Sequence, residues 1–331
     1  MKEAIRLQRT DNLAAASEAL AYLDQGREFY NSALSSSSNA SRPLQLYYAY
    51  MNIAKSFVIS RGNYDSLPEL FHGIIEDAGT KNDGLDALLT LKPNVAGNPK
   101  LNVFDLFSQA LGYPPLTAKR NVKISHVIPQ ILPGHRLWSA GAGKKERFIA
   151  IEEIRFLHGS RTKKVWTQYE IDRGDLKRLG LTQSDLLVRS GLGDRFEIVK
   201  SGVRPNTKPI IFQQKDTNTN KRPTDELPAL VDEIREMLWS TVGSSPPYRR
   251  YYLYAAPPSE ALDRMPQLLS IYALTFYLGS LTRYRPNKYA ALLSGPMAGR
   301  ISDFIQGQPA QFVYLTASEF LRRDVTRPSI V

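Results

Sequence analysis

Cysteine is absent from the 331-residue sequence. This absence excludes disulfide bonds, zinc–thiolate sites and catalysis by a thiol nucleophile. Histidine is scarce, with four residues in the whole chain. They lie far apart and show no pair at the i, i+4 spacing of a helical metal site. We therefore expect neither a metal site nor a cofactor.

The sequence also lacks the motifs GxxxxGK[ST], GxGxxG, HExxH and GxSxG, which would indicate phosphate, dinucleotide, zinc or acyl-transfer chemistry. Residues 141–145 (GAGKK) resemble a phosphate-binding loop superficially, but the glycine spacing is wrong and no strand precedes them. The residues therefore indicate no standard catalytic class.

No hydrophobic run is long enough for a membrane helix, which needs roughly 20 apolar residues. The longest uncharged stretch, residues 267–282, also contains serine, threonine, glycine and tyrosine. The first residues, MKEAIRLQRTDN, are charged and lack the apolar centre of a signal peptide. We expect a cytoplasmic protein without a membrane partner.

Positive charge is concentrated in one part of the chain. The formal net charge is +11, and residues 119–222 contain 22 Lys and Arg against 10 Asp and Glu. The flanking segments are close to neutral. Such a concentration favours an anionic partner, RNA or DNA, or another polyanion. A solvated surface with a positive bias is the alternative.

Aromatic residues interleave with the cations of this segment, as stacking on nucleic-acid bases requires. Lys164 and Trp166 alternate in a predicted strand and so share one face, although such aromatics belong more often to a core. A further cationic cluster ends a predicted C-terminal helix, where it would also complement the helix dipole. The candidate nucleic-acid-binding residues are Lys144, Lys145, Arg147, Arg155, Arg161, Lys163, Lys164, Trp166, Arg283, Arg285 and Lys288.

Residues 41–73 contain the highest density of secondary-structure signals in the sequence. Apolar residues recur at helical spacing, Pro43 and Gly62 punctuate the two ends, and Ser66 and Glu69 have capping-box spacing around Pro68. The pattern predicts a helical hairpin whose second helix begins near Pro68. Its polar residues Asn52, Lys55 and His72 form a candidate pocket. The alternatives are a structural histidine bonded to the first helix and a solvated lysine.

This stretch, PLQLYYAYMNIAKSFVISRG followed by FHG, resembles the signature of YaaC-like proteins, a bacterial family of largely undefined activity. The resemblance extends to residues 27–30 and to LTRYRPNKYAALL near the C-terminus. More loosely, the tyrosine pair, Ala-Lys and the later histidine resemble the helical hairpin of HEPN-type domains.

Arg120, Asn121 and His126 resemble the Arg-x(4–6)-His motif of HEPN-type ribonucleases. With His72 they are the candidate catalytic residues, since histidine would move the proton of the 2′-hydroxyl while arginine stabilises the phosphorane. The motif follows Pro114 and Pro115, however, instead of lying on the long apolar helix. A solvated Arg120 and a structural His126 are the alternative.

Local patterns predict an α+β fold in which N- and C-terminal helices pack together around a β-rich basic insertion. The predicted helices are 13–34, 102–112, 182–189, 227–239 and 259–284, with a last apolar segment at 312–321. The predicted strands are 148–155, 164–171, 195–199 and 209–213, with a hairpin tip at 158–164. The expected parts are 1–118, 119–222 and 223–331, and two independent helical domains are the alternative.

We therefore expect a YaaC-like bacterial protein that binds nucleic acid or another polyanion within a larger assembly or defence system. One alternative is a metal-independent endoribonuclease of HEPN type. Another is a scaffold that oligomerises through residues 259–284 and binds no nucleic acid. We also expect a protein partner or a homo-oligomer.

Overall fold

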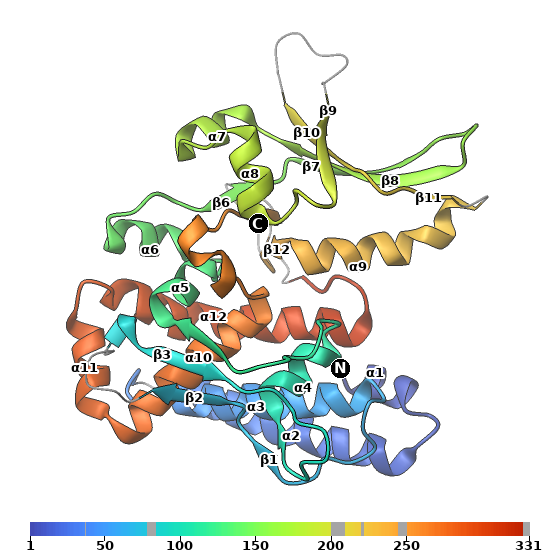
Figure 1. The fold of residues 1–331 in the computed structure, drawn as a ribbon. Helices are drawn as coiled ribbons and strands as arrows, with labels where there is room; N and C mark the ends of the chain where they lie inside the picture. Colours follow the sequence, from blue (N-terminus) through green and yellow to red (C-terminus); the bar gives the residue numbers. More distant parts are fainter. Residues whose placement is uncertain (37, 78–83, 200–208, 220–221, 244–249, 327–331) are drawn as a thin grey trace. The chain divides into compact units, whose positions relative to one another are not determined.

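The computed structural model describes residues 1–36, 38–77, 84–199, 209–219, 222–243 and 250–326. These form two compact units (Figure 1): unit 1 comprises residues 1–142 and 267–326, and unit 2 comprises residues 143–266. The expected α+β class with a helical scaffold is confirmed. The segment borders differ from those expected, because residues 119–142 belong to unit 1 and residues 223–266 to unit 2.

Unit 1 is built around one central helix, α3, which contacts helices from both ends of the chain. Asn12 begins α2 by accepting a hydrogen bond from the Ala15 amide at 3.0 Å, as an N-cap does. The helices of unit 1 are α1 (Lys2–Gln8), α2 (Leu13–Ser35), α3 (Arg42–Ser60), α4 (Val103–Ala110), α5 (Ile124–Val127), α6 (His135–Ala142), α10 (Gln267–Tyr284), α11 (Pro286–Ser294) and α12 (Ala298–Leu321), with 3-10 turns η1 (Gly84–Asp86) and η2 (Ile128–Gln130).

Small residues let the helices approach α3 closely. A Cβ placed on Gly26 of α2 would lie 3.1 Å from the Ala49 carbonyl, and one on Gly279 of α10 would lie 3.3 Å from the Tyr47 Cβ. On α12, Phe312 stacks on Tyr50 with ring centroids 3.8 Å apart. These contacts confirm that N- and C-terminal helices share one core.

The apolar helix of the C-terminal half is covered by its own unit. Its side chains from Gln267 to Gly279 are all buried, and Leu281 is buried as well. It begins at Gln267 rather than at residue 259, because Pro266 precedes it and residues 258–263 form a 3-10 turn. The buried part of this helix therefore offers no apolar face to a second copy, and the expected oligomerisation stays a prediction.

The prediction of a second helix beginning near Pro68 is also wrong. Residues 66–77 form two short strands instead, and the backbone between them turns at Gly73 with a φ of +76°. The backbone groups bond to residues distant in sequence: the Lys92 amide donates to the Gly73 carbonyl and the Phe104 amide to the His72 carbonyl. These pairings replace the hydrogen bonds of a helix, so tertiary contacts override the capping signals.

The strands of unit 1 form two small sheets. In the three-stranded antiparallel sheet β2–β3–β5, Leu91 pairs with Ile74 on one side and Arg120 on the other. In the second sheet, β1 pairs parallel to β4. The strands are β1 (Leu70–Phe71), β2 (Ile74–Asp77), β3 (Leu88–Leu91), β4 (Leu101–Asn102) and β5 (Arg120–Lys123).

Unit 2 contains the β-rich segment. Its larger sheet has the order β11–β8–β10–β9, with β7 on the other edge of β8. A smaller sheet has the order β12–β13–β6. The strands are β6 (Phe148–Ala150), β7 (Glu153–His158), β8 (Lys164–Ile171), β9 (Phe196–Val199), β10 (Ile210–Gln214), β11 (Asn218–Thr219), β12 (Trp239–Ser240) and β13 (Tyr251–Tyr254).

The sequence predicted one strand at residues 148–155, but the structure has two. Ile151 donates its amide to the Tyr251 carbonyl in the smaller sheet, and Glu152 donates its amide to the Glu170 carbonyl in the larger one. The chain therefore changes sheets between β6 and β7, which a local pattern of β-branched residues does not show.

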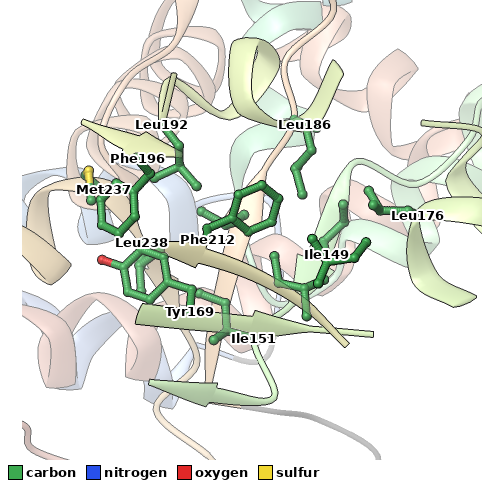
Figure 2. Close-up of a cluster of buried hydrophobic side chains, with 14 of the residues drawn as sticks. Ile149, Ile151, Tyr169, Leu176, Leu186, Leu192, Phe196, Phe212, Met237 and Leu238 are labelled. Carbon is green, nitrogen blue, oxygen red and sulfur yellow. The ribbon is translucent and has the colours of Figure 1, made fainter. Parts of the chain in front are cut away.

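The core of unit 2 lies between the larger sheet and its helices (Figure 2). Tyr169 and Phe212 point into it from β8 and β10, and Leu186 reaches it from α8. Alternation along β8 explains this, since residues 165, 167, 169 and 171 are all buried. The helices of unit 2 are α7 (Arg173–Leu179), α8 (Gln183–Ser190) and α9 (Leu227–Met237), with 3-10 turns η3 (Pro223–Glu226) and η4 (Pro258–Asp263).

Within the ranges that the structure describes, every helix is too short or too polar to span a bilayer.

Candidate functional site

The candidate pocket residue His72 lies on the turn between β1 and β2, against α3. Its Nδ1 is 2.6 Å from the hydroxyl of Tyr47. The Tyr47 ring is buried and packs edge-on against Tyr272 and Phe276 of α10, with centroids 5.7 and 5.3 Å apart. Residues of two helices, α3 and α10, thus surround one side of the imidazole, while His72 as a whole is exposed.

The electrostatics of this site keep the imidazole neutral. The pKa of His72 is lowered, first by burial and then by the positive charges of Lys55 and Arg283. Burial raises the pKa of Tyr47 well above its usual value, so its phenol stays protonated. We assign its hydroxyl as the donor to Nδ1, which leaves the proton of the neutral ring on Nε2.

Lys55 lies on the same helix, α3, and is half-buried. Its ammonium lies 5.0 Å from the centre of the Tyr22 ring on α2. Burial lowers its pKa. Within the ranges that the structure describes, no carboxylate forms an ion pair with Lys55, so its charge is not neutralised there.

Arg283 stands at the C-terminal end of α10 and is exposed. Its Nη1 donates to the Tyr48 hydroxyl at 3.1 Å, and its guanidinium lies 4.9 Å from the Tyr284 ring centroid. Arg285 behaves differently, because it forms an ion pair with Glu76 of β2, which also accepts a hydrogen bond from Ser280 at 3.0 Å. Lys288 lies in the first turn of α11 and is half-buried.

Lys55 and His72 belong to the expected pocket, and Arg283 belongs to the expected cationic cluster at the end of the C-terminal helix. The positive charges of Lys55 and Arg283 both lower the pKa of His72. Asn52, the third pocket residue, is buried on α3, where its side-chain amide donates to the Tyr48 carbonyl at 3.0 Å. The alternative of a structural histidine bonded to the first helix is confirmed by the contact between His72 and the Tyr47 hydroxyl, although the sequence did not single out Tyr47.

The other candidate catalytic residues lie on the three-stranded sheet of unit 1 and on the helix that follows it. Arg120 and Asn121 belong to β5, where Asn121 accepts a hydrogen bond from Thr90 at 2.8 Å. His126 lies on α5, beyond the opposite end of β5 from Arg120. In the HEPN-type motif, the arginine and the histidine lie on one long helix and share a face. Here Arg120 lies on a strand and His126 on the helix that follows, so the arrangement differs from that motif.

The second candidate site is the β7–β8 hairpin of unit 2, whose tip was expected at residues 158–164. The structure confirms the turn, in which the Gly159 amide donates to the Lys164 carbonyl at 2.9 Å. Arg161, Lys163 and Lys164 are exposed there. No acidic residue occurs between Glu153 and Glu170. We name Arg161, Lys163 and Lys164 the basic tip.

Trp166 is half-buried and shares the outer face of β8 with Lys164. Glu170 lies on the same face, and β7 contributes Glu153 opposite it. Arg155, a candidate nucleic-acid contact, donates to both of these carboxylates, at 2.6 and 2.5 Å. The positive charge of this face is therefore confined to the end near the tip.

The predicted role of Arg147 in nucleic-acid binding requires a correction. It is buried on all sides and bonds through two nitrogens to the Glu260 carboxylate, while Nη1 also donates to the Tyr254 hydroxyl at 3.0 Å. Its role is therefore inside the protein, not at a nucleic-acid surface. Lys144 and Lys145 are exposed, and Lys145 lies close to Gly180.

Other cations of the basic segment are also paired. Arg178 bonds to Glu146 at 2.8 Å, and Arg195 lies 3.2 Å from Glu236 of α9. The acidic side chains of α9 belong to the same unit, so the positive excess counted along residues 119–222 is partly neutralised in space.

In the described part of the chain, no three His, Asp or Glu side chains gather as metal ligands would.

Comparison with known proteins identifies the family. A family model described as YaaC-like protein matches residues 2–320, nearly the whole chain. The chain belongs to the YaaC-like family. The match does not show a relation to HEPN-type domains. Neither a curated protein nor a solved structure matches this YaaC-like chain.

Proposed function

We propose that this YaaC-like protein binds nucleic acid through the basic tip of the β7–β8 hairpin. The observation that carries the proposal is the segregation of charge along the hairpin. Cations occupy its end, whereas Glu153 and Glu170 lie near its base on the outer face. Since phosphate contacts supply most of the sequence-independent affinity for nucleic acid, three exposed cations on one turn suit the backbone of a strand.

The hairpin also offers an aromatic side chain. Trp166 lies two residues from Lys164 on the same face, so a base could stack on the indole while its phosphate contacts the lysine. Duplex nucleic acid has no splayed bases, and would use the basic tip alone. Single-stranded RNA or DNA is therefore the ligand that this arrangement fits best.

Fluorescence anisotropy with a labelled single-stranded oligonucleotide tests the proposal, measured from about 50 to about 200 mM salt, the range in which phosphate contacts dominate. The variant is the triple substitution Arg161→Gln, Lys163→Asn and Lys164→Gln. Asparagine suits position 163 because the φ of Lys163 is +58°, a left-handed conformation that Asn tolerates.

Three lost phosphate contacts should reduce the slope of log K against log salt by about 2, at roughly 0.7 per contact on a single strand. The matched control removes the same charge elsewhere, at the exposed residues Lys119, Lys123 and Lys177. An unchanged slope in the basic-tip variant, or an equal change in the control, would overturn the proposal.

Two further measurements separate the alternative functions. Incubating the same RNA with the protein in EDTA tests for metal-independent cleavage. Cleavage that disappears in His72→Gln or His126→Gln would favour a ribonuclease over a binding protein. Light scattering of the protein alone, and with the oligonucleotide, tests for an assembly of several copies.

A further inference from the structure

The larger sheet of unit 2 carries two glutamines side by side on its outer face. We propose that Gln168 and Gln213 read the Watson–Crick edge of a uracil or thymine in a bound single strand. The inference rests on the proposed nucleic-acid binding and deepens it, because contacts to phosphates alone do not distinguish one base from another. We name Gln168 and Gln213 the amide pair.

The pairing of the strands places the two amides in contact. Gln213 of β10 lies directly opposite Gln168 of β8, and the Gln168 Nε2 donates to the Gln213 Oε1 at 2.7 Å. Trp166 lies two residues before Gln168 on the same face of β8, a separation of roughly 7 Å along a strand. A single strand that stacks one base on Trp166 can therefore present a neighbouring base to the amide pair.

The amide pair lies on the face of the sheet opposite the core. The adjacent residues Tyr169 and Phe212 point into the core from the other face (Figure 2). Both glutamines are half-buried. Within the described ranges, the Gln168 Oε1 and the Gln213 Nε2 form no hydrogen bond, and neither atom is buried. An acceptor and a donor are therefore left for a ligand.

The charges beside the amide pair favour a base over a phosphate. Glu197 of β9 is the next residue across the sheet and is exposed. On the other side lies Arg155 of β7, whose charge is compensated by Glu153 and Glu170. Phosphates are therefore repelled here and attracted at the basic tip, which leaves the uncharged edge of a base as the group that suits the amide pair.

Donors and acceptors alternate along the amide pair. Each amide has a carbonyl oxygen with two lone pairs and an NH2 group with two protons. The bond between the amides uses one proton and one lone pair. The Gln168 Nε2, the Gln213 Oε1 and the Gln213 Nε2 thus present a donor, an acceptor and a donor in a row. Rotating both amides by half a turn reverses the bond but keeps the alternation.

Uracil and thymine are the bases that match this row. Their Watson–Crick edge presents an acceptor, a donor and an acceptor, which complements all three groups. Cytosine and guanine each place two like groups side by side, and adenine has one donor and one acceptor, so none of these bases makes all three contacts. Base pairing in a duplex occupies the same edge, which again favours a single strand.

Fluorescence anisotropy with labelled oligonucleotides of equal length tests the inference. The probes are oligo(U), oligo(C), oligo(dT), oligo(dC) and oligo(U) methylated at N3 of its bases. We expect oligo(U) to bind about fivefold tighter than oligo(C), the effect of one additional neutral hydrogen bond. Methylation at N3 removes the central donor of uracil and should abolish this preference. The same comparison of oligo(dT) with oligo(dC) shows whether DNA is read as RNA is.

Gln168→Met and Gln213→Met remove an amide with little change in side-chain volume. Each variant should bring the affinity ratio of oligo(U) to oligo(C) close to one. A cross-strand contact with only a structural role would lower the thermal stability and leave this ratio unchanged. The matched control is Gln183→Met, which replaces a half-buried glutamine of α8 and should keep the preference.

Three results would overturn the inference: equal binding of oligo(U) and oligo(C), equal binding of oligo(U) and its N3-methylated form, or an unchanged ratio in either glutamine variant. The salt slope reports the phosphate contacts, whereas the ratio reports the base edge. Binding that depends on the basic tip but not on the base would contradict only the inference about the amide pair. Absence of binding to every oligonucleotide would contradict both proposals.

Discussion

Replacing Arg147 by methionine removes one half of a buried ion pair in unit 2. Arg147 and Glu260 are 113 positions apart in the chain, and their side chains are 7% and 10% exposed. Burial raises the pKa of the third partner, Tyr254, to about 12, so its hydroxyl stays protonated and accepts from the guanidinium. The substitution leaves the Glu260 carboxylate buried without its cation.

Breaking a buried pair in this way destabilises a protein by about 3 to 5 kcal/mol. That is a large share of a total folding stability of about 5 to 15 kcal/mol. At roughly 3 °C per kcal/mol for a chain of this size, the melting temperature should fall by about 10 °C. Urea unfolding followed by tryptophan fluorescence suits the measurement, because Trp239 lies 5.5 Å from Tyr254.

Two comparisons decide the reasoning. The double substitution Arg147→Met with Glu260→Leu removes both charges together and should restore most of the lost stability, since an apolar pair can replace a buried ion pair. Arg155→Met breaks the exposed pairs with Glu153 and Glu170 and should lose no more than about 1 kcal/mol. An Arg147→Met loss as small as that of Arg155→Met would refute the structural role.

Two further predictions concern unit 1. His72 has a lowered pKa, so its contribution to stability is present above pH about 6.5 and lost as the pH falls below that value. Lys55→Met removes a repelling charge, so it should raise the pKa of His72 in an imidazole titration and make this acid loss smaller. An unchanged pKa would contradict the electrostatic coupling. Gly73→Ala should destabilise by more than about 1 kcal/mol, because φ is +76° and the new Cβ would lie 2.9 Å from the Asn102 Cβ. Gly97→Ala, with φ of +79° and open space around it, is the control in thermal unfolding and should show the smaller loss.

Local patterns predicted much of the secondary structure. The helix expected at residues 13–34 is α2 (Leu13–Ser35), and the strand expected at 164–171 is β8 (Lys164–Ile171). Their periods, 3.6 residues in one and 2 in the other, depend on neighbours along the chain, which the sequence displays directly. The same holds for the hairpin tip after β7, because glycine and basic turn residues separate two β-branched runs.

Where a segment finds its hydrogen bonds elsewhere in the chain, the same patterns failed. Residues 66–77 have capping-box spacing, yet they pair with residues 88–104 as strands. The strand predicted at 148–155 divides between two sheets for the same reason. Long-range pairings satisfy the backbone equally well, and a local signal worth about 1 kcal/mol does not outweigh them.

By itself, the sequence determined which residue types were present and how they alternate: no thiol chemistry, a basic middle segment, a tyrosine-rich central helix and a hairpin with no acidic residue between Glu153 and Glu170. Only the tertiary structure decided which charges remain available. It buried Arg147 against Glu260, paired Arg285 with Glu76, and placed His72 of the β1–β2 turn against Tyr47 of α3. The physical reason is that a charge interacts with its neighbours in space, and folding brings together residues that lie up to hundreds of positions apart.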